Sequence, residues 1–263
     1  MQPSKRLVIG VIFLSLFSRL FALPETSDET LGETPAPAED NWYKQYLTPT
    51  PSAKAQLTSN YIWRGVSQSN NAAAVQGQFQ LSTPSGLHLT IWGSTVNFDD
   101  NNEDRARLEI IPEIKFIKKM NISDDEGSIE IGARRYIYPK SEGLNFNEYF
   151  IGLNYDVLFI RLDVTNTFYA SNDTAIYASA GFNSIIPPKL IKQFKGISWG
   201  GRFGHYEFKG GTYGERDYTD YALYVQKAWN ALSLRLNWTG TNGGYNAGSF
   251  DNSGFILTLA AFL

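Results

Sequence analysis

The last nine residues of the chain limit its possible folds more than any other segment. Counted backwards in twos from the end, Leu263, Ala261, Leu259, Leu257 and Phe255 are all apolar. Because alternate residues of a strand point to the same face, this segment is predicted to be a strand with one apolar face. Such a strand closes transmembrane β-barrels, in which the apolar face meets lipid and the last strand pairs with the first. A strand buried in a β-sandwich has the same alternation, so the rest of the chain has to decide between them.

The same period of two recurs throughout residues 53–263. Near the C-terminus, for example, Leu232 and Leu234 alternate with Ser233 and Arg235. About twelve segments of this kind are separated by runs of turn-forming residues. The predicted fold is therefore all-β: a transmembrane antiparallel up-and-down β-barrel of about twelve strands, with a secreted β-sandwich as the less favoured alternative.

Aromatic content and the lengths of the connections favour the barrel. Phe, Trp and Tyr make up 14% of the chain, which suits the aromatic girdles that barrels place at the two membrane interfaces. Tight turns are expected near residues 155–156 and 229–230, and longer connections at 99–105, 209–217 and 240–254. Outer-membrane barrels alternate short periplasmic turns with long extracellular loops in this way.

The N-terminal segment predicts where the protein is located. Lys5 and Arg6 precede an apolar stretch at residues 7–21, which is the pattern of a secretory signal peptide covering residues 1–22. Cleavage is expected near Ala22. For a barrel, this signal predicts the outer membrane of a Gram-negative bacterium.

Residues 23–52 are predicted to be an acidic, Pro-rich periplasmic linker, and residues 53–263 the outer-membrane β-barrel. The linker has six acidic side chains against Lys44 and few large apolar ones, so it cannot bury enough surface to fold alone. The barrel region is nearly neutral, and without a basic face no nucleic-acid binding is expected. The expected partners are outer-membrane lipid and, through the C-terminal strand, the barrel-assembly machinery. The oligomeric state is left open.

Charged residues on the polar side of the predicted strands are expected to line the lumen. An Arg or Lys on the lipid face would cost about 2–4 kcal/mol near the midplane of the bilayer. Two interpretations stay open: opposed charges line a water-filled constriction that sets ion preference, or they pair across a narrow lumen and fill it. The predicted lumen-lining residues are Arg64, Arg107, Glu109, Glu113, Lys115, Glu130, Arg134, Glu148, Arg161, Asp163, Arg202, Asp220 and Arg235.

Catalysis is not expected, so the chain is predicted not to be an enzyme. Only His88 and His205 offer an imidazole, and the sequence has no G-x-S-x-G motif and no two-histidine metal motif. No cofactor and no metal are therefore predicted. The acidic run at 99–104 lacks EF-hand spacing and is interpreted as a solvated loop, and the Gly-rich segment at 240–254 as a flexible surface loop.

A long motif near the start of the barrel region resembles a known family. Residues 57–68 read Leu-Thr-Ser-Asn-Tyr-Ile-Trp-Arg-Gly-Val-Ser-Gln, and residues 74–77 read Ala-Val-Gln-Gly. This pattern resembles the TorF family of proposed outer-membrane porins, also called Gcw_chp. The resemblance implies a single barrel over residues 53–263, with the first motif in the first strand and the Gln-Gly pair opening the second. One departure is Leu263, which stands where such barrels usually end in an aromatic residue.

The predicted function is passive diffusion of small hydrophilic solutes or ions through a narrow, charge-lined lumen. Little selectivity is expected, because seven basic and six acidic residues nearly balance. Arg134 and Arg161 are predicted to lie near mid-depth and to influence ion preference. The alternative is a non-conducting structural or receptor barrel whose lumen is filled by salt bridges; an outer-membrane enzyme is less favoured.

Overall fold

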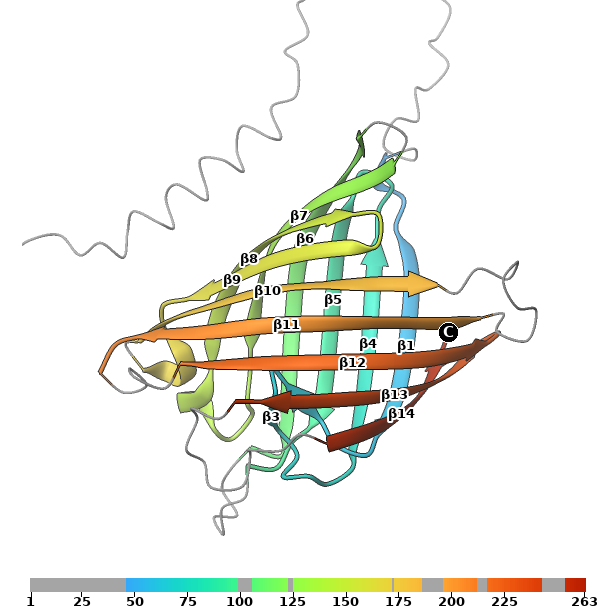
Figure 1. Ribbon diagram of the computed structural model, residues 1–263. Coiled ribbons are helices and arrows are strands. Elements are labelled where there is room, and N and C mark those ends of the chain that lie inside the picture. Colours follow the sequence, from blue (N-terminus) through green and yellow to red (C-terminus); the bar gives the residue numbers. More distant parts are fainter. Residues whose placement is uncertain are drawn as a thin grey trace, which may run out of the picture. The chain divides into compact units, whose positions relative to one another are not determined.

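The computed structural model describes residues 46–98, 106–122, 125–171, 173–185, 196–211, 217–242 and 254–263. In this part of the chain, twelve strands form one closed antiparallel barrel (Figure 1). The predicted all-β barrel is thereby confirmed. The predicted signal peptide, most of the predicted linker, the acidic run at 99–104 and most of the Gly-rich segment at 240–254 lie outside the described residues.

The barrel strands follow one another around the wall in chain order, and each pairs with its neighbours. Two one-turn 3-10 helices, η1 (Glu142–Leu144) and η2 (Phe168–Ala170), lie in the connections that follow the fifth and seventh barrel strands. The barrel strands are β1 (Thr50–Thr58), β4 (Ala74–Ser82), β5 (Leu87–Thr95), β6 (Leu108–Ile122), β7 (Asp125–Tyr136), β8 (Phe146–Tyr155), β9 (Leu158–Thr165), β10 (Thr174–Ile185), β11 (Ile197–Lys209), β12 (Tyr218–Trp229), β13 (Leu232–Thr241) and β14 (Gly254–Phe262).

The barrel closes where its first and last strands meet. β1 pairs with β4 on one side and with β14 on the other, so that Lys54 lies opposite both Gln78 and Phe262. Beyond this pair, the Leu263 N–H donates to the Ala53 carbonyl at 2.9 Å. The predicted pairing of the C-terminal strand with the first strand is confirmed. β1 begins at Thr50, three residues before the predicted start of the barrel.

The outer face of the barrel is apolar. On β13, Leu232, Leu234 and Leu236 are 49%, 37% and 41% exposed, whereas Ser233 is buried on the lumen side. Apolar surface in water costs about 25 cal/mol per Å², and a lipid environment removes that cost. The alternation that produced the β prediction is therefore the pattern of a transmembrane barrel wall. Among the described residues, no helix is long and apolar enough to cross a bilayer.

The two rims of the barrel have different connections. The turns after β8 and β12 are tight, and Asp156 and Asn230 take left-handed conformations in them, with φ of 50° and 46°. Both turns lie where the sequence predicts them. β1 begins and β14 ends at this same rim, which we call the terminal rim. The opposite rim, which carries η1, η2 and the connection from β1 to β4, is the loop rim.

The connection from β1 to β4, residues 59–73, folds into the barrel, and we call it the inward loop. It contains a short hairpin formed by β2 (Ile62–Trp63) and β3 (Val66–Ser67). The prediction that the family motif lies in the first strand is wrong, because β1 ends at Thr58 and most of the motif is in this loop.

Local hydrogen bonds and one glycine explain why the chain leaves the barrel wall here. The side-chain oxygen of Asn60 accepts hydrogen bonds from the hydroxyls of Ser67 and Ser69, at 2.7 Å and 3.0 Å. Gly65 occupies the hairpin turn with φ of 81°, a conformation that a side chain disfavours. A Cβ atom at this position would lie 2.6 Å from the Cβ of Asp220. The hairpin can therefore approach the barrel wall because residue 65 is glycine.

Aromatic side chains surround the tip of the inward loop. The Trp63 ring lies 5.6 Å from that of Tyr136, 6.0 Å from Tyr206 and 6.4 Å from both Phe146 and Phe168. The four side chains around Trp63 are each at most 2% exposed. This part of the lumen is thus a packed core and not an open channel.

Candidate functional site

Arg64, at the tip of the inward loop, fixes the loop to the opposite wall of the barrel. Its guanidinium donates to both carboxylate oxygens of Glu148, at 2.7 Å and 2.9 Å, and to the Tyr206 hydroxyl at 3.0 Å. Asp163 lies 3.5 Å away. Arg64 is 5% exposed and Glu148 1%, so this is a buried, bidentate ion pair.

Aromatic rings complete the environment of the Arg64 guanidinium. Its carbon lies 4.2 Å from the ring centre of Tyr177 and 4.6 Å from that of Trp63. Such cation–π contacts add to the charge pairing. Burial works against the charged form, but Glu148, Tyr206 and Asp163 together outweigh it and hold the pKa of Arg64 above its ordinary value. Arg64 therefore stays charged in its buried position.

A second contact ties the inward loop to β6. The Tyr61 hydroxyl donates to Glu109 at 2.7 Å, and Tyr138 donates to the other oxygen of the same carboxylate at 2.5 Å. Burial, together with the negative charge of Glu109, raises the pKa of the Tyr61 phenol well above its ordinary value. The phenol therefore keeps its proton and acts as a donor. Glu109 is a structural anchor, because it is 2% exposed and has both oxygens bonded.

The wall formed by β6–β9 holds a network of paired charges. Arg134 lies 3.2 Å from Asp163 and 3.4 Å from Glu113, and Arg161 lies 2.7 Å from Glu130 and 3.0 Å from Asp163. Arg134 and Arg161, predicted to influence ion preference, are thus members of a charge network that leaves few free carboxylates. Lys115 completes the network at 3.5 Å from Glu113.

The remaining predicted residues lie in three different settings. Asp220 is fully buried and accepts hydrogen bonds from Arg202 and from the Tyr177 hydroxyl. Arg235 lies over the ring of Tyr224, with 3.7 Å between its guanidinium carbon and the ring centre. Arg107 lies outside the strands just before β6, where it is exposed and donates to Asn97 at 2.6 Å.

Two cavities lie beside the inward loop. The larger, about 530 Å³, runs between the loop and the wall of β1 and β11–β14, and the smaller, about 330 Å³, lies between the loop and β4–β7. Tyr61, Trp63 and Trp92 line both cavities. Among the described residues, the inward loop therefore separates two spaces in the lumen, of which the larger is mainly polar.

The larger cavity extends along most of the barrel. Lys54 and Phe262 line it near the terminal rim, and Asn60 and Thr239 line it towards the loop rim. Lys54 is a lumen residue that the sequence prediction missed. The signal was present, because Lys54, Gln56 and Thr58 alternate with apolar residues, but the predicted charged set began at residue 64.

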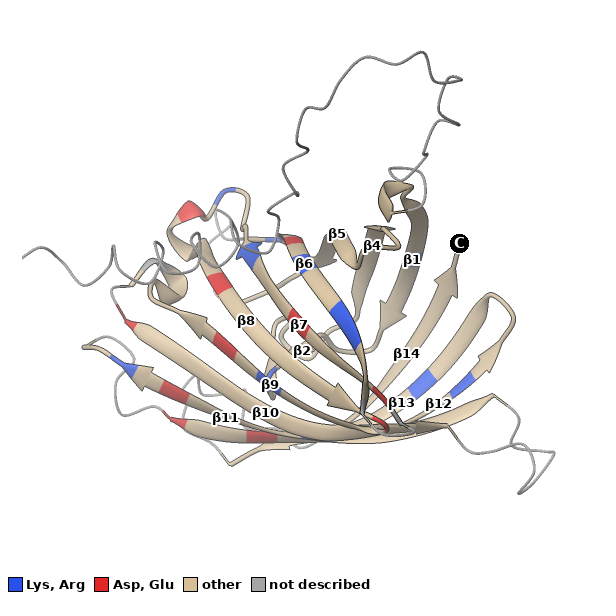
Figure 2. Cartoon of the chain, turned by 90° about the horizontal axis from the view of Figure 1, so that it is seen from above, with Lys and Arg blue, Asp and Glu red and all other residues tan. Residues whose placement is uncertain are grey.

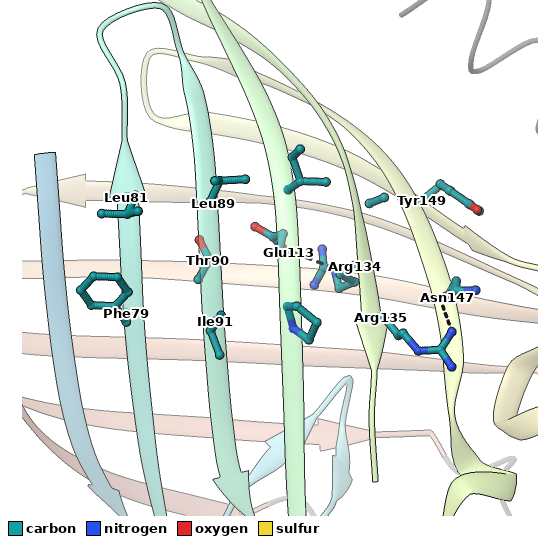
Figure 3. Close-up of a pocket in the computed structure, with 13 residues that line it drawn as sticks. Phe79, Leu81, Leu89, Thr90, Ile91, Glu113, Arg134, Arg135, Asn147 and Tyr149 are labelled. Carbon is teal, nitrogen blue, oxygen red and sulfur yellow. Dashed lines mark hydrogen bonds and ion pairs between the residues drawn. The ribbon is translucent and has the colours of Figure 1, made fainter. Parts of the chain in front are cut away.

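A third hollow, of about 550 Å³, lies on the outer face of the barrel. Figure 3 shows its apolar side chains on β4, β5 and β8, including Phe79, Ile91 and Tyr149, and the hydrogen bond from Arg135 to Asn147. Phe79 and Ile91 are 48% and 57% exposed. Its apolar lining suits lipid chains, so we do not assign it to a hydrophilic solute.

The histidines lie in different places. His88 faces the lumen near the terminal rim and is 2.9 Å from the Ser82 hydroxyl, and His205 is exposed and bonded to Thr219. Within the described ranges, no group of three His, Cys, Asp or Glu side chains is placed to hold a metal ion. The chemistry present in the described lumen is charge pairing and hydrogen bonding.

The solved structures that resemble this chain include two porins and another outer membrane protein. The NanC porin, in a rhombohedral crystal form, aligns with 81% of this chain and 100% of its own at 9% identity, with a TM-score of 0.53. The KdgM porin in complex with disordered oligogalacturonate aligns with 81% of this chain and 96% of its own (8% identity, TM-score 0.41). The outer membrane protein Omp33 of Acinetobacter baumannii aligns with 83% of this chain and 99% of its own (8% identity, TM-score 0.40). At 9% identity, the similarity to the NanC porin supports the barrel fold and nothing further.

Sequence comparison identifies the family. No curated protein matches the chain. The model of a bacterial protein family of unknown function, Gcw_chp, matches residues 48–258, which include β1, the inward loop and most of β14. Because the match extends over most of the barrel and includes the motif at residues 57–68, the chain belongs to the Gcw_chp family.

Proposed function

We propose that the protein is a porin of the Gram-negative outer membrane that passes small hydrophilic solutes or ions by passive diffusion. The observation that carries this proposal is the larger cavity, a polar space of about 530 Å³ inside a barrel with an apolar outer face. Gln56, Gln226 and Asn237 are among its lining residues. Hydrogen bonds from such side chains replace the hydrogen bonds that a polar solute makes with water, and the apolar outer wall suits lipid.

The inward loop sets the width of this pathway. Trp63 and Tyr61 occupy the middle of the lumen, and the contacts of Arg64 with Glu148 and of Tyr61 with Glu109 hold them there. Twelve strands enclose less space than the 16–18 strands of wide porins. The pathway is therefore narrow and selects small solutes.

A non-conducting barrel is the second candidate. The buried aromatic core around Trp63 and the paired charges of β6–β9 favour it, because they fill part of the lumen near the loop rim. In that case the protein has a structural or receptor role. The two candidates differ in one measurable property, the passage of ions across a lipid bilayer.

Planar-bilayer recording tests the proposal. The wild-type protein is expected to give small, stable conductance steps in KCl. Replacing residues 60–72 by Asn-Gly, which favours a tight hairpin turn, removes the hairpin and should increase the step size severalfold. Heat-modifiable migration on gels verifies that the variant still forms a barrel. Absence of steps from both folded proteins would overturn the porin proposal in favour of the second candidate.

A further inference from the structure

Acidic residues are distributed unevenly around the barrel. β13, β14, β1, β4 and β5 are consecutive in the wall and contain no Asp or Glu. Figure 2 shows acidic segments on strands such as β8, β9 and β11 and none on β13 or β14. The Lys and Arg residues of the five acid-free strands are Lys54 on β1 and Arg235 on β13. We call these five strands the acid-free sector.

The larger cavity lies against this sector, and its charged lining is entirely basic. Lys54, Arg64, Arg202 and Arg235 line it, and among the residues that the structure describes no carboxylate does. The partners of Arg64 and Arg202 are buried behind them, because Glu148 is 1% exposed and Asp220 is 0% exposed. A solute in the cavity therefore meets basic groups before it meets the carboxylates.

Lys54 and Arg235 differ from Arg64 and Arg202, the other basic residues of this cavity, in having no acidic partner within the described chain. Arg235 contacts the ring of Tyr224, and its Nε is buried without a hydrogen-bond partner. Two unpaired cations near each other in a confined space repel one another. A mobile anion entering the cavity relieves this repulsion, and the low-dielectric walls strengthen the attraction.

We propose that the larger cavity is a pathway for small organic anions that carry one or two carboxylates. Lys54 and Arg235 attract the carboxylates, and neutral groups such as Gln56, Gln226 and Asn237 bond the remaining polar atoms. The cavity volume is within the range of sites for small molecules. This inference rests on the proposed porin function and names its solute class. It also replaces the sequence-based expectation of little selectivity, which counted buried and paired carboxylates as if they faced the pathway.

Reversal potentials in a KCl gradient test the charge preference. Wild type is expected to be more permeable to chloride than to potassium. The Lys54→Gln/Arg235→Gln double variant should lower the chloride-to-potassium permeability ratio by about half or more. Arg135→Gln removes one charge from the outer face, where Arg135 is exposed, and should leave the ratio unchanged. A heat-modifiable gel shift verifies the fold of every variant.

Replacing chloride by succinate on one side tests the solute class. Wild type should carry a succinate current, and the double variant should lose most of it. Conductance steps with a preference for potassium, or a ratio that the double variant leaves unchanged, would overturn the anion pathway but not the porin function. A chloride preference without any succinate current would overturn the assignment to organic anions. Absence of conductance from wild type and from the variant that lacks residues 60–72, both folded, would overturn both proposals.

Discussion

Single residues in the lumen have two separate tasks, and burial distinguishes them. Arg64 is buried and forms ion pairs with the buried Glu148 and Asp163, so these contacts hold the inward loop in position. Lys54 and Arg235 face the larger cavity without a carboxylate partner in the described chain, so they are available to a solute. Sequence alternation is the basis for predicting which charges point inward, although that prediction omitted Lys54 and included Arg107, which lies outside the strands. Alternation carries no information on which charges find partners across the lumen.

Removing Arg64 should destabilise the barrel strongly. Arg64→Ala leaves Glu148 buried without its main partner, which typically costs about 3–5 kcal/mol. Unfolding in urea, followed by tryptophan fluorescence in micelles, measures the loss. Arg107→Ala is the matched control, because Arg107 is exposed and its side chain donates to Asn97. This substitution should change the free energy of unfolding by less than about 0.5 kcal/mol. Equal effects of the two substitutions would contradict the anchoring role of Arg64.

Gly65 offers a second test at the residue scale. Gly65→Ala forces a side chain into a left-handed conformation, at a cost of about 1–2 kcal/mol, and into contact with Asp220. The expected result is a lower midpoint of thermal unfolding. Gly77→Ala on β4 is the control, since a Cβ there meets no atom within 4 Å. A similar midpoint for both variants would show that the hairpin can move away from the wall.

At the scale of elements, the sequence predicted the strands well and the inward loop wrongly. Each strand has one apolar face, and lipid contact imposes that pattern directly on the sequence. The motif at residues 57–68 continues the same alternation past Thr58, so nothing in its period marks the end of β1. The signals that mattered were Asn60, with Ser67 and Ser69 as its donors, and Gly65 in the turn. The effect of these residues depends on the barrel wall that the hairpin approaches, which includes Asp220 of β12 and is distant in the sequence.

Hydrogen exchange should distinguish the inward loop from an ordinary surface loop. The Tyr61 N–H donates to Ser69, and the Gln68 N–H donates to the Tyr61 carbonyl at 2.7 Å, in a buried setting. Amides of residues 61–69 are therefore expected to exchange nearly as slowly as those of the neighbouring strands. Residues 139–143 at the same rim, mostly exposed, provide the comparison and should exchange quickly. Fast exchange in both segments would mean that the loop leaves the lumen in solution.

At the scale of the whole molecule, closure decides stability, since β1 must pair with β14 to complete the wall. The apolar alternation at the C-terminus was enough to predict this pairing. The acid-free sector was also present in the sequence, but its meaning depends on strand order around a ring. β13 and β14 are far from β4 and β5 in sequence, and closure makes them parts of one surface.

Two deletions test which ends of the chain the barrel requires. Deleting residues 254–263 removes β14 and exposes the edges of β1 and β13, so heat-modifiable migration should be lost. Deleting residues 23–45, whose acidic and Pro-rich composition does not suit a barrel wall, should leave migration intact. If the second deletion also abolished the folded form, the N-terminal segment would be part of the folding unit.

The attachment of the inward loop to β1 has a consequence for the order of assembly. The strand that makes the final pair with β14 continues directly into the segment that occupies the lumen. A hairpin of this bulk, once outside a completed ring, would have to thread back through the loop rim against packed aromatic rings. Insertion of the inward loop into the lumen and pairing of β1 with β14 are therefore coupled events. A substitution such as Arg64→Ala should then appear first as slower formation of the closed ring, before any effect on transport is measured.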